Sequence, residues 1–298
     1  MCLPVLAAAW FGGALPVLDL ASLAELPAAL VSGVCAIRLL LRARTKAGKG
    51  LAGLCLIPGA VALVPAPQPA SCPPAQATLR VAWINAHNPA LARPIADWIA
   101  RERPEIVGVA EVGKRARKLR AYLAKHYPYR QSCLTRGRCS TLVYAAMRPR
   151  DAEPLAHGDP ANRKALSAVR MAFAPLALGN GGEVLATHLS RPLPLGRQRA
   201  ELAELETALQ SPADAIVMGD FNMSPRMRTL RAFARRNGLR VAAAGGPTWP
   251  VRYGGHRIGG LWQIDQLLVG RNWRVAAVRR SPDLGSDHLG YVADLCRA

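Results

Sequence analysis

Two short motifs carry side chains that could act together on a phosphate ester. Gly219-Asp220-Phe221-Asn222 directly follows the apolar run 215–218, and Ser286-Asp287-His288 lies near the C-terminus. Strand ends are where a rigid sheet can hold catalytic side chains in place. Carboxylates bind a hard cation, an amide orients a ligand and an imidazole moves a proton, and metal-assisted attack on phosphorus needs all three. The two motifs therefore indicate the chemistry more clearly than the substrate.

Further polar residues end other apolar runs that have the pattern of strands. The runs 79–84, 106–110 and 183–187 are followed by Asn85, Glu111 and His188, and the run 262–269 contains Asp265. Short apolar runs bounded by polar or turn residues predict buried strands. We therefore expect the sheet edge that holds Asp220 to hold these side chains as well.

Helical and strand patterns alternate along the chain beyond residue 78. Amphipathic spacing predicts helices at 89–103, 114–126, 198–210 and 225–237, and further strands are expected at 141–146, 169–174 and 291–295. Strands and helices intermingle without an internal repeat or a glycine-rich nucleotide loop, which indicates one mixed α/β domain.

The motifs, in their order, resemble the endonuclease/exonuclease/phosphatase superfamily. They read Arg80-Val-Ala-Trp-Ile-Asn85, Ile106-Val-Gly-Val-Ala-Glu111, Ala186-Thr-His188-Leu, Met218-Gly-Asp220-Phe-Asn222, Ile264-Asp265-Gln-Leu and Gly285-Ser-Asp287-His288. The resemblance runs from about residue 79 to the C-terminus. It implies a DNase I-like α/β (α+β) fold, a four-layer sandwich of two packed β-sheets flanked by helices. The hydrophobic N-terminal region is similar to that of a membrane-anchored bacterial branch.

The resemblance also implies a metal site. Glu111 would be the principal ligand of a divalent cation, with Asn85 and Asp287 nearby. Mg²⁺ suits such oxygen ligands, and Mn²⁺ could substitute for it. His87 stands where some relatives carry an acidic ligand, so it is not assigned to the metal.

Roles in the reaction follow from the same resemblance. Asp220 would orient or deprotonate the attacking water, and Asn222 would hold that water or a phosphate oxygen. His288, oriented by Asp265, would act on the phosphate or as general base. His188 would stabilise phosphate charge or protonate the leaving group, and its acidic partner in some nucleases has no equivalent here. Of the arginines that crowd the helix after Asn222, Arg226 and Arg228 are predicted to bind substrate, the alternative being a solvated helix face.

The first 70 residues differ from the rest and predict a membrane-anchoring region of two to three helices. Apolar runs cover 3–18, 20–41 and 51–66, close to the roughly 17–25 residues that span a bilayer. A cleaved signal peptide is the alternative for the first run, although it lacks the basic start of such peptides. The basic loop 42–49 favours the cytoplasmic side. We therefore expect a bacterial inner-membrane protein whose catalytic domain, 78–298, lies outside the cytoplasm beyond a proline-rich linker ending near 77.

The charge and the cysteines of the chain are in keeping with a catalytic domain outside the cytoplasm. The 34 basic and 17 acidic residues after Ala70 give this part a net charge of +17. Such a surface attracts polyanions, although coding bias towards arginine explains the excess equally well. In an oxidising compartment the spacing of Cys133 and Cys139 favours a disulfide. A bridge between Cys72 and Cys296 is a second possibility.

Together these observations predict a membrane-anchored, Mg²⁺-dependent phosphodiesterase of the endonuclease type. Its substrate would be a phosphate ester, with nucleic acid favoured over lipid headgroups, and no protein partner is indicated. The main alternative is a phospholipid or small-molecule phosphoesterase at the membrane surface. A non-catalytic membrane-anchored binding module is a third interpretation, which the intact Glu111, Asp220, Asn222 and His288 oppose.

Overall fold

The computed structural model describes twelve stretches of the chain. These are residues 19–23, 25–42, 45–50, 52–53, 71–73, 78–87, 92–112, 116–133, 139–155, 166–175, 181–242 and 245–298. The chain divides into two compact units. One comprises Met1–Pro67 with Arg226–Arg231, and the other comprises Gln68–Pro225 with Ala232–Ala298.

In its described part, the first unit contains the 3-10 helix η1 (Leu20–Leu23) and the helix α3 (Glu25–Arg42). Leu30, Val31 and Ile37 of α3 are each more than half exposed. Across the stretches that the structure describes, every helix falls short of the length and apolar character needed to cross a membrane. The predicted span 3–18 and nearly all of 51–66 lie outside the described residues.

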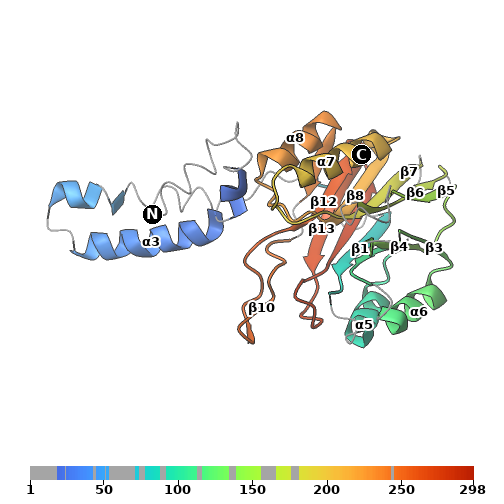
Figure 1. The fold of residues 1–298 in the computed structure, drawn as a ribbon, viewed down its shortest axis with the longest axis horizontal. Coiled ribbons are helices and arrows are strands. Elements are labelled where there is room, and N and C mark those ends of the chain that lie inside the picture. The colour runs from blue at the N-terminus through green and yellow to red at the C-terminus, as the bar shows by residue number, and fades with distance from the viewer. Residues whose placement is uncertain are drawn as a thin grey trace. The chain divides into compact units, whose positions relative to one another are not determined.

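Six strands of the second unit form one sheet in the order β13-β14-β1-β2-β4-β3 (Figure 1). Their bounds are β1 (Leu79–Asn85), β2 (Ile106–Ala110), β3 (Tyr129–Ser132), β4 (Leu142–Ala145), β13 (Trp273–Arg280) and β14 (Tyr291–Arg297). Only β1 and β2 pair in parallel among these neighbours. A parallel pair needs a crossover connection, and the amphipathic helix α5 (Ala92–Glu102) supplies it.

A second six-stranded sheet has the order β5-β6-β7-β8-β12-β9. Its strands are β5 (Asp151–Pro154), β6 (Ser167–Phe173), β7 (Gly182–His188), β8 (Ala215–Asp220), β9 (Leu239–Ala242) and β12 (Asp265–Gly270). Here β7 and β8 are the parallel pair, and the helix α7 (Arg197–Ala208) lies between them in sequence. A small hairpin, β10 (Arg252–Tyr253) with β11 (His256–Arg257), precedes β12.

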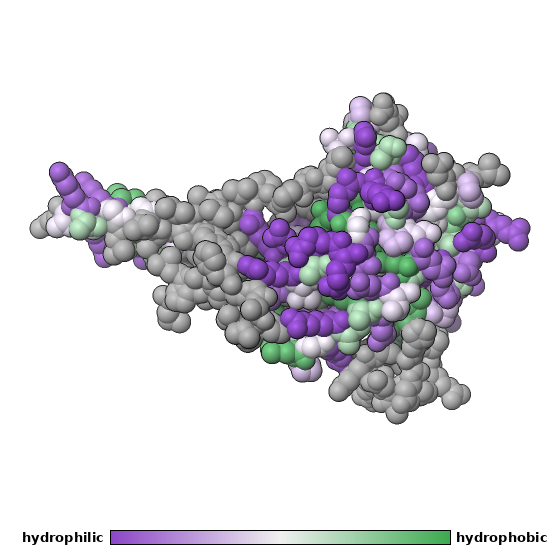
Figure 2. Space-filling model, turned by 90° about the horizontal axis from the view of Figure 1, so that it is seen from above, coloured by the Kyte–Doolittle hydropathy of each residue, from purple (hydrophilic) through white to green (hydrophobic). Residues whose placement is uncertain are grey.

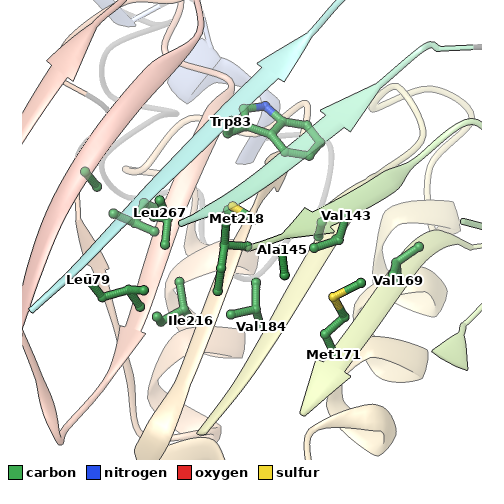
Figure 3. Close-up of a cluster of buried hydrophobic side chains, with 14 of the residues drawn as sticks. Leu79, Trp83, Val143, Ala145, Val169, Met171, Val184, Ile216, Met218 and Leu267 are labelled. Carbon is green, nitrogen blue, oxygen red and sulfur yellow. The ribbon is translucent and has the colours of Figure 1, made fainter. Parts of the chain in front are cut away.

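The main hydrophobic core lies between the two sheets. Alternate residues of each strand point to one face, so Trp83 of β1 and Met218 of β8 face the same interior (Figure 3). Gly108 of β2 lies beneath both, and a Cβ there would come within 2.8 Å of the Trp83 ring and 2.9 Å of Met218 Cε. The absence of a side chain at this position therefore lets the two sheets approach closely around Trp83.

Helices cover the outer faces of the sheets. Ile95 and Trp98 of α5 and Leu119 and Leu123 of α6 (Arg117–His126) pack on the outer face of the first sheet. Helix α7 flanks the second sheet (Figure 1), and the face of the molecule on its side is largely hydrophilic (Figure 2). The helix α8 (Arg228–Arg236) is divided between the two units. The four-layer α/β sandwich expected from the resemblance is confirmed.

Several strands escape prediction from the sequence. They are β3, β5, β9, β10, β11 and β13, and most are two to four residues long. The eight residues of β13 form an edge strand, and the C-terminal end of this strand, Arg279 and Arg280, is basic. Strand β12 begins at Asp265 rather than at Trp262, which instead makes an isolated bridge with Trp249. Short or edge strands carry little of the apolar pattern that identifies buried ones.

Two disulfides are present in the second unit. Cys133 is joined to Cys139, and Cys72 is joined to Cys296 of β14. Ser71 also forms a bridge with Val275 of β13. The chain entering the second unit is therefore tied covalently and by the backbone to the two strands at one side of the first sheet.

Candidate active site

The sheet registers bring the predicted residues together at one edge of the two sheets. In the first sheet Asn85 pairs with Ala110, so Glu111 follows directly beside it. In the second sheet His188 pairs with Asp220, and Asp220 pairs with Asp265. Asp220 thus lies between His188 and Asp265 because of strand pairing alone.

The motif around Asp220 is fitted to the close approach of β7 and β8. A Cβ at Gly219 would clash with the carbonyl oxygen of Thr187, so only glycine allows this spacing. The backbone N–H of Asn222 donates to Asp220 Oδ1 at 3.0 Å, which closes an Asx turn directly after the strand. Asn222 has a left-handed φ of 51°, and its side-chain Nδ2 donates to Leu189 O at 2.9 Å.

One half of the site is buried and consists of Asp220, Asp265 and His288. Asp265 Oδ1 accepts from Trp83 Nε1 at 2.8 Å, and Asp265 Oδ2 lies 2.9 Å from His288 Nδ1. Both oxygens of Asp265 therefore have partners, and one of these partners is the imidazole of His288. The other imidazole nitrogen, Nε2, lies 3.7 Å from Asp220 Oδ2.

Burial and charge set the protonation of this half. Burial alone would lower the pKa of His288, but the negative charges of Asp265 and Asp220 outweigh it and raise the pKa to about 10. Burial is also the main cause of the raised pKa of Asp220, and the charge of Asp265 adds to it. At neutral pH His288 is therefore an imidazolium, and Asp220 is a stronger base than an ordinary aspartate.

The raised pKa of His288 has a consequence for stability. In the folded state His288 keeps a proton that the unfolded chain releases once the pH rises above the ordinary histidine pKa of 6.5. This contribution is complete below pH 6.5 and is lost as the pH rises to about 10. In a chelator, we expect the melting temperature to fall over this window, and to fall less in His288→Asn, whose amide can still donate to Asp265. Equal pH dependence of the two proteins would contradict the assignment.

The other half of the site is more open and contains Glu111, His87 and Asp287, and the buried Asn85 lies between the two halves. Asn85 Nδ2 donates to Glu111 Oε1 at 3.2 Å and to Asp220 Oδ2 at 3.1 Å, so it connects the two halves. Glu111 has a left-handed φ of 57°. Such a conformation costs a non-glycine residue energy and is concentrated at functional sites.

Charges around Glu111 keep it ionised. Burial would raise its pKa, but His188, the Asn85 hydrogen bond and His87 together outweigh burial and leave the pKa below its usual value. His188 Nε2 lies 3.8 Å from Glu111 Oε1 and 3.6 Å from Asp220 Oδ2. Glu111 and Asp220 are therefore acidic neighbours of His188, and the sequence alone identified neither of them as its partner.

Two sets of side chains could hold a metal ion. Asp220, Asp265 and His288 each offer a donor atom, and these atoms lie within 4.8 Å of one another. Two of those three groups are already hydrogen-bonded to each other, so we favour the second set, Glu111 with Asp287. Asp287 Oδ2 accepts from Trp249 Nε1 at 3.1 Å, whereas its buried Oδ1 has no hydrogen-bond partner. A buried carboxylate oxygen without a donor fits a cation at this position.

Several residues of the site were not predicted from the sequence. Trp83 orients Asp265, as described above. Ser286 Oγ donates to Asn85 O at 2.7 Å and accepts from the His288 amide at 3.1 Å, which joins the two motifs. Both residues lie inside the motifs that carry the resemblance, but nothing in their type indicates these contacts. The predicted Arg226 and Arg228 belong to the first unit, and their substrate-binding role stays a prediction.

Comparisons with known proteins agree with the fold. The family model described as "Endonuclease/Exonuclease/phosphatase family" matches residues 81–288. A search of curated proteins finds no match. Among solved structures, an endonuclease/exonuclease/phosphatase from Beutenbergia cavernae is 21% identical, with a TM-score of 0.59 over 74% of this chain and 72% of that one.

Two further structures share the fold at lower identity. The human Nocturnin catalytic domain with bound sulfate is 16% identical, with a TM-score of 0.58 over 76% of this chain and 96% of that one. A mannosyl-6-phosphatase from Bacteroides thetaiotaomicron is 14% identical, with a TM-score of 0.56 over 73% of this chain and 99% of that one. Because the family model covers more than half of the sequence, the chain belongs to the endonuclease/exonuclease/phosphatase family.

Proposed function

We propose that the protein hydrolyses a phosphodiester by attack of water, with the help of a divalent metal ion. The observation that carries this proposal is that the side-chain amide of Asn85 donates both to Asp220, whose carboxylate lies beside the imidazole of His288, and to the more open carboxylate of Glu111. Phosphodiester hydrolysis needs an activated water, neutralised phosphate charge and a protonated leaving group.

The protonation state of each residue determines the role that we assign to it. Asp220, a base strengthened by burial, would take the proton of the attacking water. His288, held as an imidazolium by Asp265, would donate a hydrogen bond to a phosphate oxygen. His188, which lies beside Glu111 and Asp220, would protonate the leaving oxygen, and the side-chain amide of Asn222 would orient the water or the phosphate.

Glu111, Asp287 and Asn85 would hold the metal. A bound divalent cation would supply charge neutralisation for the phosphate and lower the pKa of a bound water. Mg²⁺ is the ordinary choice for carboxylate and amide oxygens, and Mn²⁺ can replace it. Ionised Glu111 supports this assignment, because its lowered pKa keeps the negative charge available across the neutral pH range.

Nucleic acid is the substrate that we favour. The net charge of +17 beyond Ala70 attracts polyanions before any specific contact forms. Lipid headgroups are the second candidate, for which the β10–β11 hairpin offers support. It follows Trp249 closely and exposes the large side chain of Tyr253, and Ile258, which directly follows β11, is also exposed. Exposed aromatic and aliphatic side chains suit a membrane interface as well as a nucleobase.

Membrane association through the N-terminal region remains part of the proposal. The apolar runs of the first 70 residues and the basic loop 42–49 favour it, with the catalytic unit outside the cytoplasm of a bacterial inner membrane. Two disulfides in the catalytic unit are in keeping with an oxidising compartment. The exposed apolar side chains of α3 would also lie favourably in lipid.

A substrate panel tests the proposed function. Purified full-length protein would be given supercoiled DNA, RNA and phospholipid vesicles, each with Mg²⁺ or Mn²⁺ and with chelator. We expect metal-dependent cleavage of nucleic acid that weakens as salt is raised, because phosphate contacts release counterions. Cleavage of lipid alone would replace the favoured substrate by the second candidate. No cleavage of any ester with either metal would contradict the proposal.

A further inference from the structure

Helix α7, which flanks the second sheet (Figure 1), has a buried face that is half polar. Its four buried residues are Gln198, Glu201, Leu202 and Leu205. Gln198 and Glu201 are three positions apart, so their side chains lie on the same side of the helix. Such side chains are seldom buried, and a buried carboxylate is costly unless it is hydrogen-bonded. Two more apolar side chains would attach the helix at a lower cost, so this polar pair needs another explanation.

Glu201 holds the segment that follows His188. Its Oε2 accepts from the backbone N–H of Ser190 at 2.8 Å, and its Oε1 accepts from Ser190 Oγ at 2.5 Å. Burial is the main cause of the raised pKa of Glu201, and the two hydrogen bonds from Ser190 act in the opposite direction. Both carboxylate oxygens are therefore bonded to one residue, which stands two positions after the end of β7.

Gln198 joins this segment to the one that follows Asp220. Its side-chain Nε2 donates to the carbonyl oxygen of Ser190 at 2.8 Å. The same nitrogen lies 3.2 Å from the carbonyl oxygens of both Phe221 and Asn222 and donates to them as well. One side-chain amide therefore bridges the backbone after β7 and the backbone after β8.

The two segments also bond each other directly. The backbone N–H of Leu189 donates to Asp220 O at 2.8 Å, and Asn222 Nδ2 donates to Leu189 O at 2.9 Å. Asn222 has a left-handed φ of 51°, which costs a non-glycine residue energy and persists only where the surrounding structure enforces it. The hydrogen bond from Gln198 to the Asn222 carbonyl is one of the contacts that enforce it.

We infer that Gln198 and Glu201 are positioning residues of the active site. They hold the end of β7, which carries His188, against the end of β8, which carries Asp220 and Asn222. The inference rests on the proposed function, since that function gives these three side chains their roles. It predicts that loss of the polar pair lowers turnover and spares metal binding, because the proposed metal ligands lie in or next to strands of the first sheet.

A purely structural role makes a different prediction. If Gln198 and Glu201 only attached α7 to the sheet, their loss should act like the loss of a buried leucine on the same face. The melting temperature would then fall, and kcat would stay near wild type at temperatures where the protein is folded. Leu205 is fully buried on this face of α7 and provides the matched control.

The test compares full-length wild type with Gln198→Met, Glu201→Leu, Glu201→Gln and the control Leu205→Ala. Methionine and leucine keep much of the side-chain volume and remove the hydrogen bonds. We expect Gln198→Met and Glu201→Leu each to lower kcat for bis(4-nitrophenyl) phosphate by roughly 10–100-fold, because a misplacement of about 1 Å can cost 10²-fold. KM and the metal concentration for half-maximal activity should change little. Leu205→Ala should lower the melting temperature at least as much and leave kcat near wild type.

Glu201→Gln should retain most of the rate. Its Oε1 can still accept from the backbone N–H of Ser190, and its Nε2 can donate to Ser190 Oγ, because a hydroxyl group both donates and accepts. A low rate in Glu201→Gln, equal to that of Glu201→Leu, would contradict positioning by these hydrogen bonds.

Amide hydrogen exchange gives a readout that does not depend on turnover. We expect faster exchange in peptides that cover residues 186–192 and 218–224 in Gln198→Met and Glu201→Leu, and no such selective change in Leu205→Ala. Wild-type kcat and exchange in both variants would overturn the inference alone, provided that Asp220→Asn is inactive. A loss of kcat in Leu205→Ala as large as theirs would also overturn it. If wild type hydrolyses no ester, the proposed function and the inference fall together.

Discussion

Replacing Asp220 by Asn should lower the rate of phosphodiester hydrolysis by roughly 10²–10⁴-fold, the usual contribution of a positioned general base. Asp220 is 2% exposed, and its Oδ2 lies within 3.7 Å of a nitrogen of both His188 and His288. The amide keeps the shape of the side chain and can still accept from the Asn222 backbone at Oδ1. The substitution therefore removes the base while leaving the turn in place. Initial rates at saturating metal would measure the loss.

A matched control separates catalysis from folding. Asp294 is almost as buried, at 5% exposed, but it pairs with Arg80 and Arg279 away from the site. Burial would raise the pKa of Asp294, but these two arginines outweigh it and lower that pKa, so its charge stabilises the fold. Asp294→Asn should lower the melting temperature and leave kcat near wild type. Near-native turnover by Asp220→Asn would refute its assignment as the base.

Replacing Glu111 by Gln should raise the metal concentration required for half-maximal activity by at least ~10-fold. Residues that only hydrogen-bond to a metal ligand already contribute this much to metal affinity. The lowered pKa of Glu111 shows that the surrounding groups favour its charge, and glutamine removes that charge without changing the shape. Rate measurements over a series of Mg²⁺ and Mn²⁺ concentrations would give the shift. Partial recovery of the rate at high metal is expected, because Asp287 and Asn85 remain.

Glu206→Gln is the control for this variant. Glu206 on α7 is as exposed as Glu111, 33% against 32%, but it pairs with Arg236 on the surface. Its substitution should leave the metal requirement unchanged, because exposed ion pairs contribute little even to stability. An unchanged metal requirement in Glu111→Gln would exclude that residue as a principal ligand.

The catalytic part of the fold could be predicted because the relevant strands are buried on both faces. Such strands have continuous apolar runs, and Asn85, Glu111, His188 and Asp220 stand at their ends. The structure adds the registers, which no local pattern contains. These registers place Asp220 between His188 and Asp265 and bring Glu111 beside Asn85.

Other features depend on contacts between distant segments. Trp83 has the sequence signature of a core residue, and its hydrogen bond to Asp265 depends on how the two sheets face each other. His87 Nδ1 lies 3.1 Å from Glu111 Oε2, a contact between residues 24 positions apart that no local pattern contains. The Cys72–Cys296 bridge joins residues 224 positions apart, and spacing cannot identify such a pair.

The most direct test is hydrolysis of bis(4-nitrophenyl) phosphate by the full-length protein, with Mg²⁺ or Mn²⁺, with chelator, and after metal is added back. This diester needs no nucleic-acid or lipid recognition, so it reports on the chemistry of the site alone. We predict hydrolysis that chelator stops, that metal restores and that Asp220→Asn reduces to near background. Hydrolysis that persists in chelator, or that Asp220→Asn performs as fast as wild type, would contradict a metal-assisted attack organised by Asp220 and Glu111.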